Sequence, residues 1–240
     1  MQPQRNLSSQ ATARETTFDA GLRSYFQKIY NTMAVGLVFT GLVAWVVAHS
    51  PMLLEVFFGN GVVRMIVMFA PLGFLFFGFT PGRLQRMSAM KLAGLFYAFS
   101  GVFGISLATI FLAYSGESIA RVFFITSAMF AGMSVYGYTT KRDLSGMRSM
   151  LFMGVWGLFI AMLVNMFFHS PLVYFVTSCI GVVVYTGLTM WDTQNLKMMY
   201  SAANGHEANN KMAIMGALSL YVDFINLFMF LLRLMGNSRN

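Results

Sequence analysis

Residues 212–235 read MAIMGALSLYVDFINLFMFLLRLM, and this stretch decides the fold. An α-helix of this length extends about 36 Å at 1.5 Å per residue. Only Asp223 and Arg233 within it carry charge. Because about 20 mostly apolar residues suffice to cross a bilayer, the stretch predicts a transmembrane helix with a carboxyl group near its middle.

The rest of the chain contains further apolar stretches of similar length. Of its 240 residues, 57% are hydrophobic and 10% are charged, and the mean hydropathy is +0.65. Soluble domains carry about 25% charged residues, so the composition excludes a soluble enzyme, a disordered chain and a nucleic-acid-binding domain. We expect an all-α polytopic membrane protein whose seven spans cover residues 29–49, 62–79, 89–114, 119–138, 150–168, 172–192 and 212–235. Pro71 should kink the second span, and a neighbouring helix should satisfy the carbonyl that it frees.

The basic residues alternate between the links. Lys and Arg occur in the N-terminal segment and in the links after spans two, four and six, whereas residues 50–61, 115–118 and 169–171 contain none. Basic loops stay in the cytoplasm. The alternation predicts a cytoplasmic N-terminus and an external C-terminus, and the short links suit a bacterial inner membrane.

The N-terminal segment divides in two. Residues 1–16 are polar, and we expect them to be disordered. Residues 17–28 continue into the first span with an apolar stripe, which predicts an amphipathic helix at the membrane surface. The seven-helix domain then occupies residues 29–236.

Two acidic residues lie within spans. Asp223 is near the middle of span seven and Asp192 is at the inner end of span six. A carboxylate in mid-membrane is unfavourable by about 3 kcal/mol, so it is a functional hypothesis by default. Counted from the external ends of their spans, Asp192 is about 31 Å deep and Asp223 about 18 Å. From helix lengths alone, the two carboxyl groups are therefore not expected to lie at the same depth in the membrane.

Span seven also carries a polar stripe. Asn226 and Arg233 follow Asp223 by 3 and 10 residues, which places all three on one side of the helix. Arg233 is about 15 Å along the axis from Asp223, too far for an ion pair, and we expect it to extend towards the membrane surface. Asn165 in span five is a further buried polar residue, with a structural role.

Three motifs identify a family resemblance. Residues 218–236 (LSLYVDFINLFMFLLRLMG) closely resemble the terminal signature of the Bax inhibitor-1 family, and Trp191-Asp-Thr-Gln194 resembles its aspartate motif on span six. The basic link that begins at residues 140–145 (TKRDLS) also fits. The resemblance implies a central seventh helix wrapped by the other six, and an Asp192–Asp223 pair that senses pH and gates a calcium leak.

The implied site has further members. Family members can place a basic residue from the end of span two against the aspartates, and Arg83 and Arg86 both qualify here. Two carboxyl groups within hydrogen-bonding distance share a proton, because two negative charges that close together repel each other strongly. With Asn226 in the polar lining they offer too few oxygen ligands for a tight calcium site, so Asp192 and Asp223 would bind calcium weakly and transiently.

The sequence favours transport over enzymatic function. An intramembrane aspartyl protease needs Gly-x-Gly-Asp where this chain has Leu-Tyr-Val-Asp223. The histidines lie too far apart for a zinc hydrolase, and no lysine lies mid-span in span seven for retinal. We expect no enzyme activity and no cofactor, with the lipid bilayer and calcium ions as partners. The alternative is a regulatory membrane protein that acts on a membrane protease or on other membrane proteins in quality control or stress survival.

Overall fold

The computed structural model describes the backbone of residues 3–237 and the side chains of residues 19–237. Within that range the chain is helical, and seven helices are long and apolar enough to cross a membrane. The long helices are α1 (Pro3–His49), α3 (Gly61–Gly78), α5 (Ala89–Ala113), α6 (Gly116–Thr139), α7 (Arg148–Phe168), α8 (Pro171–Met199) and α9 (Gly205–Met235). The links contain α2 (Pro51–Leu54), α4 (Pro81–Arg86) and the single turns η1 (Glu55–Gly59), η2 (Ser145–Met147) and η3 (Ala202–Asn204).

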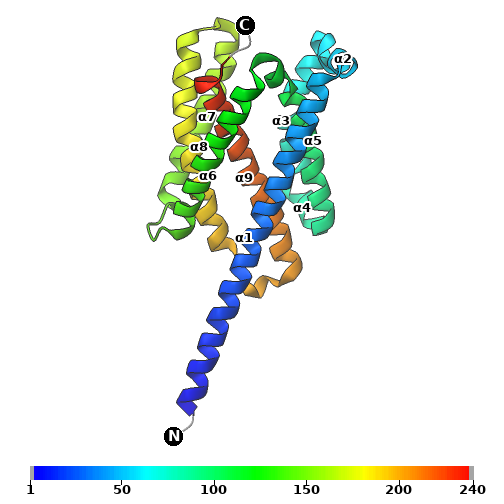
Figure 1. Ribbon diagram of the computed structural model, residues 1–240. Coiled ribbons are helices and arrows are strands. Elements are labelled where there is room, and N and C mark those ends of the chain that lie inside the picture. Colours follow the sequence, from blue (N-terminus) through cyan, green and yellow to red (C-terminus); the bar gives the residue numbers. More distant parts are fainter. Residues whose placement is uncertain (1–2, 238–240) are drawn as a thin grey trace.

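The seven-span prediction is confirmed. Figure 1 shows the two ends of the chain at opposite ends of the bundle, as an odd number of crossings requires. The links at residues 79–88, 140–147 and 200–204 lie at one end, which we call the basic end. The links at residues 50–60, 114–115 and 169–170 lie at the other end, which we call the opposite end.

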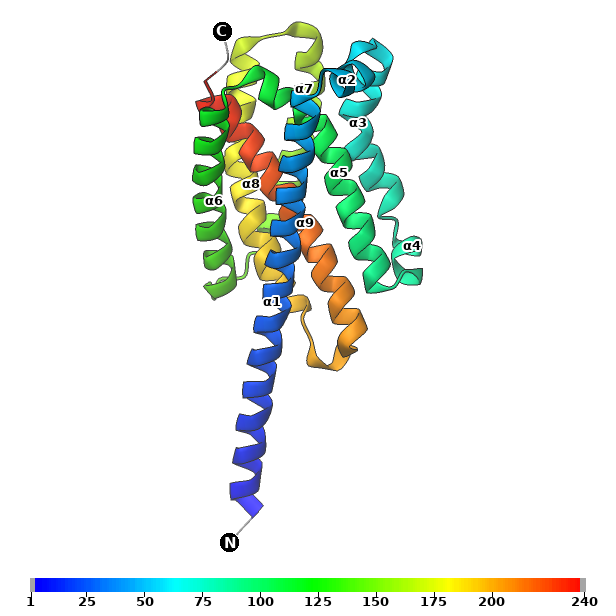
Figure 2. The ribbon, with the colours of Figure 1, turned by 45° about the vertical axis from the view of Figure 1, so that its right-hand side comes forward.

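Helix α9 is the centre of the bundle. Inside the protein, 72% of its most apolar stretch is buried, against at most 44% for any other span. It packs on α1, α5, α6 and α8, while α3 packs chiefly on α5 and α7 chiefly on α8. Figure 2 shows α9 crossing diagonally between these neighbours. The central seventh helix thus packs along its length on four helices, and α7 and α3 lie mainly outside these.

Helix α1 differs from the arrangement expected for the N-terminal segment. It is continuous from Pro3 to His49, so residues 17–28 are not set off from the first span by a break. The aromatic side chains of Tyr25 and Phe26 are buried in the bundle. Their rings lie 5.3 Å from Tyr200 and 4.9 Å from Tyr138, measured between centroids. This part of the stripe therefore packs on protein.

Pro71 lies inside α3, as expected. Because proline has no N–H, the carbonyl of Val67 four residues earlier lacks its helical partner. The hydroxyl of Ser106, on α5, donates a hydrogen bond to this carbonyl. The neighbouring helix thus satisfies the backbone group that proline frees, which the low-polarity interior of a membrane demands.

Candidate functional site

The two intramembrane aspartates meet in the core. Asp192 on α8 and Asp223 on α9 are 8% and 4% exposed, and their carboxyl groups lie close enough to interact directly. A hydrogen bond between two carboxyl groups needs a proton on one of them, since ionised carboxylates only accept. The pair that helix lengths alone did not predict is present in the folded protein.

The helix register explains how the pair forms. Gly181 of α8 lies against the ring of Phe230, and Gly216 of α9 lies against Leu196. Counted from these contacts, α9 ends opposite position 176, roughly 8 Å inside the start of α8 at 1.5 Å per residue. Asp223 is then level with position 188, one turn from Asp192. Side chains lean towards the N-terminus of their own helix, so on antiparallel helices these two lean towards each other.

Ser219 is the third member of the site. Its hydroxyl donates a hydrogen bond of 2.7 Å to Oδ2 of Asp192. The Oδ2 atom of Asp223 is buried with no hydrogen-bond partner among the described residues. Ser219 was not among the residues predicted from the sequence, although it precedes Asp223 by four residues and so shares its face of α9.

The other predicted site residues lie elsewhere. Arg83 and Arg86 are exposed on α4, and the guanidinium of Arg83 donates to the carbonyl of Phe77. The amide of Asn226 donates to the Val222 carbonyl of its own helix at 2.8 Å. Within the described part of the chain, the structure thus brings together Asp192 and Asp223 but adds neither arginine nor Asn226 to their contacts.

The residues beside Asp192 anchor α8 to its surroundings. Trp191 packs under the guanidinium of Arg148, 5.5 Å from the ring centroid. The hydroxyls of Thr193 and Ser134 are 3.0 Å apart. Gln194 accepts from the backbone N–H of Leu144 and donates to the carbonyl of Arg142 in the link between α6 and α7. Each residue of the Trp-Asp-Thr-Gln motif thus has a separate contact, which fixes the orientation of Asp192.

The opposite side of α9 is held by a second polar contact. The hydroxyl oxygen of Tyr221 lies 2.6 Å from that of Thr40 on α1, and the Thr40 hydroxyl is 2.9 Å from the carbonyl of Ser100 on α5. Residues two apart on a helix point about 200° apart. Tyr221 therefore fixes α9 to α1 and α5, while Asp223 faces α8.

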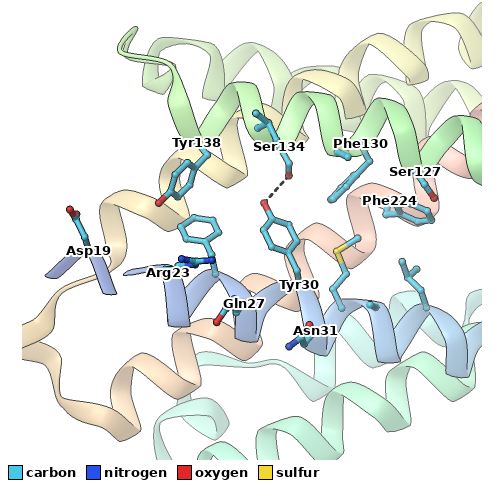
Figure 3. Close-up of a pocket in the computed structure, with 16 residues that line it drawn as sticks. Asp19, Arg23, Gln27, Tyr30, Asn31, Ser127, Phe130, Ser134, Tyr138 and Phe224 are labelled. Carbon is cyan, nitrogen blue, oxygen red and sulfur yellow. Dashed lines mark hydrogen bonds between the residues drawn. The ribbon is translucent and has the colours of Figure 1, made fainter. Parts of the chain in front are cut away.

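A pocket of about 1010 Å³ lies between α1 and α6, and neither Asp192 nor Asp223 lines it. Figure 3 shows Asp19, Arg23 and Gln27 at one end and Phe130 with Phe224 towards the other. The hydroxyl of Tyr30 crosses it to Ser134 at 3.1 Å, and Ser134 continues to Thr193. The pocket wall is thus connected by hydrogen bonds to the residue that follows Asp192.

The site contains few possible metal ligands. In residues 19–237, no group of three or more His, Cys, Asp or Glu side chains could hold a metal ion. The two carboxyl groups and the Ser219 hydroxyl supply oxygen atoms only, which are the ligands that calcium prefers. Three side chains fall short of the six to eight oxygen ligands of a stable calcium site.

Comparison with known proteins agrees with this architecture. The family described as "Inhibitor of apoptosis-promoting Bax1" matches residues 22–240. The chain is 43% identical to inner membrane protein YbhL of Escherichia coli (strain K12) over 222 residues, which cover 92% of this chain and 94% of that protein. It is 46% identical to protein RP147 of Rickettsia prowazekii (strain Madrid E), over 95% of this chain and 96% of that one. A membrane protein of Streptococcus pyogenes serotype M6 is 31% identical over 93% of this chain and 96% of its own length. The protein is therefore an integral membrane protein that belongs to the Bax inhibitor-1 family.

Proposed function

We propose that this protein is a pH-sensitive calcium leak of a bacterial inner membrane, gated by Asp192 and Asp223. The observation that carries the proposal is the close approach of these two buried carboxyl groups in the core of the bundle, between α8 and the central helix α9. The proposal includes a cytoplasmic N-terminus. It assigns the protein no catalysed reaction and no cofactor.

Proton exchange at the pair supplies the energy for gating. Ser219 donates to Asp192, so Asp192 is better placed to hold negative charge and Asp223 to hold the shared proton. Two unit charges 4 Å apart repel by about 4 kcal/mol at an effective dielectric constant of 20. Gaining or losing one proton therefore changes the contact energy of α8 and α9 enough to shift a balanced two-state equilibrium by about three orders of magnitude.

On this proposal the structure is the closed state. Both carboxyl groups are buried, and the pocket between α1 and α6 is crossed by the Tyr30–Ser134 hydrogen bond. A cation reaches the pair when α8 and α9 move apart. The Tyr221–Thr40 contact on the far side of α9 makes a movement of α8 and α6 away from α9 easier than a movement of α9 itself.

Calcium entry into sealed proteoliposomes tests the function. The purified protein is reconstituted into vesicles that enclose a calcium-sensitive dye, and external calcium is added at several pH values. We expect flux above that of empty vesicles, with a rate that varies with pH. No excess flux at any pH would refute the leak and leave the alternative, a regulatory role towards a membrane protease or other membrane proteins.

A matched pair of variants tests whether the pH dependence comes from the carboxyl pair or from another acidic residue. Asp223→Asn keeps the shape and hydrogen bonding of the side chain but cannot titrate, and it should flatten the pH dependence. Asp143→Asn is the control, because Asp143 is exposed in the link between α6 and α7. Its Oδ1 accepts from the N–H of Ser145, a bond that asparagine retains. The control should keep the wild-type pH profile.

A further inference from the structure

A second polar pocket lies at the opposite end of the bundle. It has a volume of about 420 Å³ and is lined by the end of α7, the start of α8 and the end of α9. Among the described residues, its lining includes one guanidinium and no Asp or Glu. Its lining includes Met162, Asn165, Ser170, Tyr174 and Arg233.

Arg233 lies against this pocket with few hydrogen-bond partners. Its guanidinium stacks between Tyr174 and Phe230, 5.3 and 5.4 Å from the ring centroids. Within residues 19–237, its one hydrogen-bond acceptor is Sδ of Met162, at 3.2 Å. A thioether sulfur is a weak acceptor, and a guanidinium has five N–H donors. The expectation that Arg233 simply extends to the membrane surface does not describe this half-enclosed position.

Asn165 presents donors to the same pocket. Its backbone carbonyl accepts from the N–H of His169 at 2.8 Å, and its side-chain Oδ1 accepts from the N–H of Ser170 at 2.9 Å. These bonds hold the turn between α7 and α8, where His169 adopts a left-handed conformation with φ of 51°. Because the turn occupies Oδ1, the side-chain NH₂ group is what Asn165 has left to offer a ligand.

The donor set matches a phosphate group. A planar guanidinium binds two oxygens of a phosphate or carboxylate in parallel, which is why arginine recurs at such sites. Its two aromatic neighbours hold the planar group in place and screen it from water, which strengthens its attraction for a negative charge. No carboxylate in the described lining competes for that charge.

We propose that this pocket is an anion site that binds a single phosphate group through Arg233 and Asn165. The phosphate belongs either to a phospholipid in the adjoining leaflet or to a free anion in solution. Arg233 follows Asp223 by ten residues, about 15 Å along α9. The anion site is therefore separate from the carboxyl pair and does not depend on the proposed leak.

Thermal unfolding of the full-length protein in non-ionic detergent tests the proposal. One arm titrates inorganic phosphate at constant ionic strength against chloride, and the other titrates phosphatidylglycerol against diacylglycerol, which has the same chains without the phosphate. We expect a saturable rise in unfolding temperature in at least one arm, because a ligand that binds only the folded state stabilises it. A rise with phosphate alone identifies a free anion as ligand, and a rise with phosphatidylglycerol alone identifies the lipid headgroup.

Three variants test whether this pocket causes the rise in unfolding temperature. Arg233→Gln should raise the half-maximal concentration at least about tenfold, the lower limit for losing a charge-assisted hydrogen bond. Arg121→Gln is the control, since Arg121 lies at the same end and donates to the carbonyl of Met235, and it should bind as the wild type does. Asn165→Asp keeps the acceptor for Ser170 while placing a negative charge beside Arg233, so it should abolish the rise in unfolding temperature.

The Asn165→Asp variant keeps the test decisive if Arg233→Gln does not fold. Equal binding by wild type and Asn165→Asp, or by wild type and a folded Arg233→Gln, would overturn the proposal. So would the absence of a saturable rise in both arms for the wild type.

Discussion

Replacing Gly137 by alanine tests the contact that holds α6 against α8 beside the aspartate motif. A Cβ at Gly137 would lie 2.3 Å from the carbonyl oxygen of Met190, a backbone atom that cannot rotate away. Ordinary contact begins at 3.4 Å, so the two helices must separate by about 1.1 Å at this point. The same movement would stretch the 3.0 Å contact between Ser134 and Thr193 to about 4 Å, beyond hydrogen-bonding distance.

The expected magnitude follows from this overlap. Forcing a methyl group into a close-packed contact costs about 1–3 kcal/mol, and for a chain of this size each 1 kcal/mol lowers the unfolding temperature by roughly 2–4 °C. We therefore expect Gly137→Ala to unfold about 2–12 °C below the wild type in the same detergent.

The matched control lies five residues earlier on the same helix. A Cβ at Gly132 meets nothing within 4 Å, and alanine is the better helix former by about 1 kcal/mol. Gly132→Ala should therefore unfold at or above the wild-type temperature. Equal unfolding temperatures for the two variants would show that α6 and α8 are not in close contact at Gly137.

Three further predictions concern orientation and anchoring. A reporter active only in the cytoplasm should be silent when fused to the C-terminus, and activity would show that the orientation is reversed. Tyr221→Phe removes the contact with Thr40 and should destabilise the protein by about 1 kcal/mol, measured as a lower unfolding temperature; an unchanged temperature would mean that the contact does not hold α9. Gln194→Ala removes the two bonds to Leu144 and Arg142 and should speed tryptic cleavage of that link in detergent; an unchanged cleavage rate would show that the link is held by other contacts.

The spans could be predicted from the sequence because their signal is local. Each of the seven stretches is long and apolar enough by itself, and hydrophobic length is the dominant constraint in a bilayer. The satisfied carbonyl before Pro71 was predictable for the same reason, although its partner Ser106 was not, since no local pattern fixes which helix lies alongside.

The carboxyl pair shows where local reasoning stops. Depth counted from the turns placed Asp192 and Asp223 about 13 Å apart, because it assumed helices that end level with one another. The contacts of Gly181 with Phe230 and of Gly216 with Leu196 instead set α9 towards the basic end. In membrane bundles, close packing at small residues determines how far one helix is shifted along its neighbour. This shift depends on the side chains of both helices, so neither helix alone predicts it. Family resemblance supplied the pair where helix counting did not.

Some of the remaining site residues could have been found from a local sequence pattern, and others could not. Ser219 could have been found from its spacing of four residues to Asp223, which places both on one helix face. The setting of Arg233 between Tyr174 and Phe230 could not, because Tyr174 belongs to another helix. Arg83 and Arg86 came from the family pattern alone, and both are exposed on α4 in this structure.

The pH profile of calcium flux in proteoliposomes, compared among wild type, Asp223→Asn, Asp192→Asn and the double variant, tests the central claim most directly. If the two carboxyl groups act as one gate, each single variant flattens the dependence of calcium flux on pH, because each removes one of the two groups that exchange the shared proton. The double variant then adds little, because residues that act as a unit are not additive. Single variants that fold and retain the wild-type profile would contradict the account and place the pH sensor elsewhere.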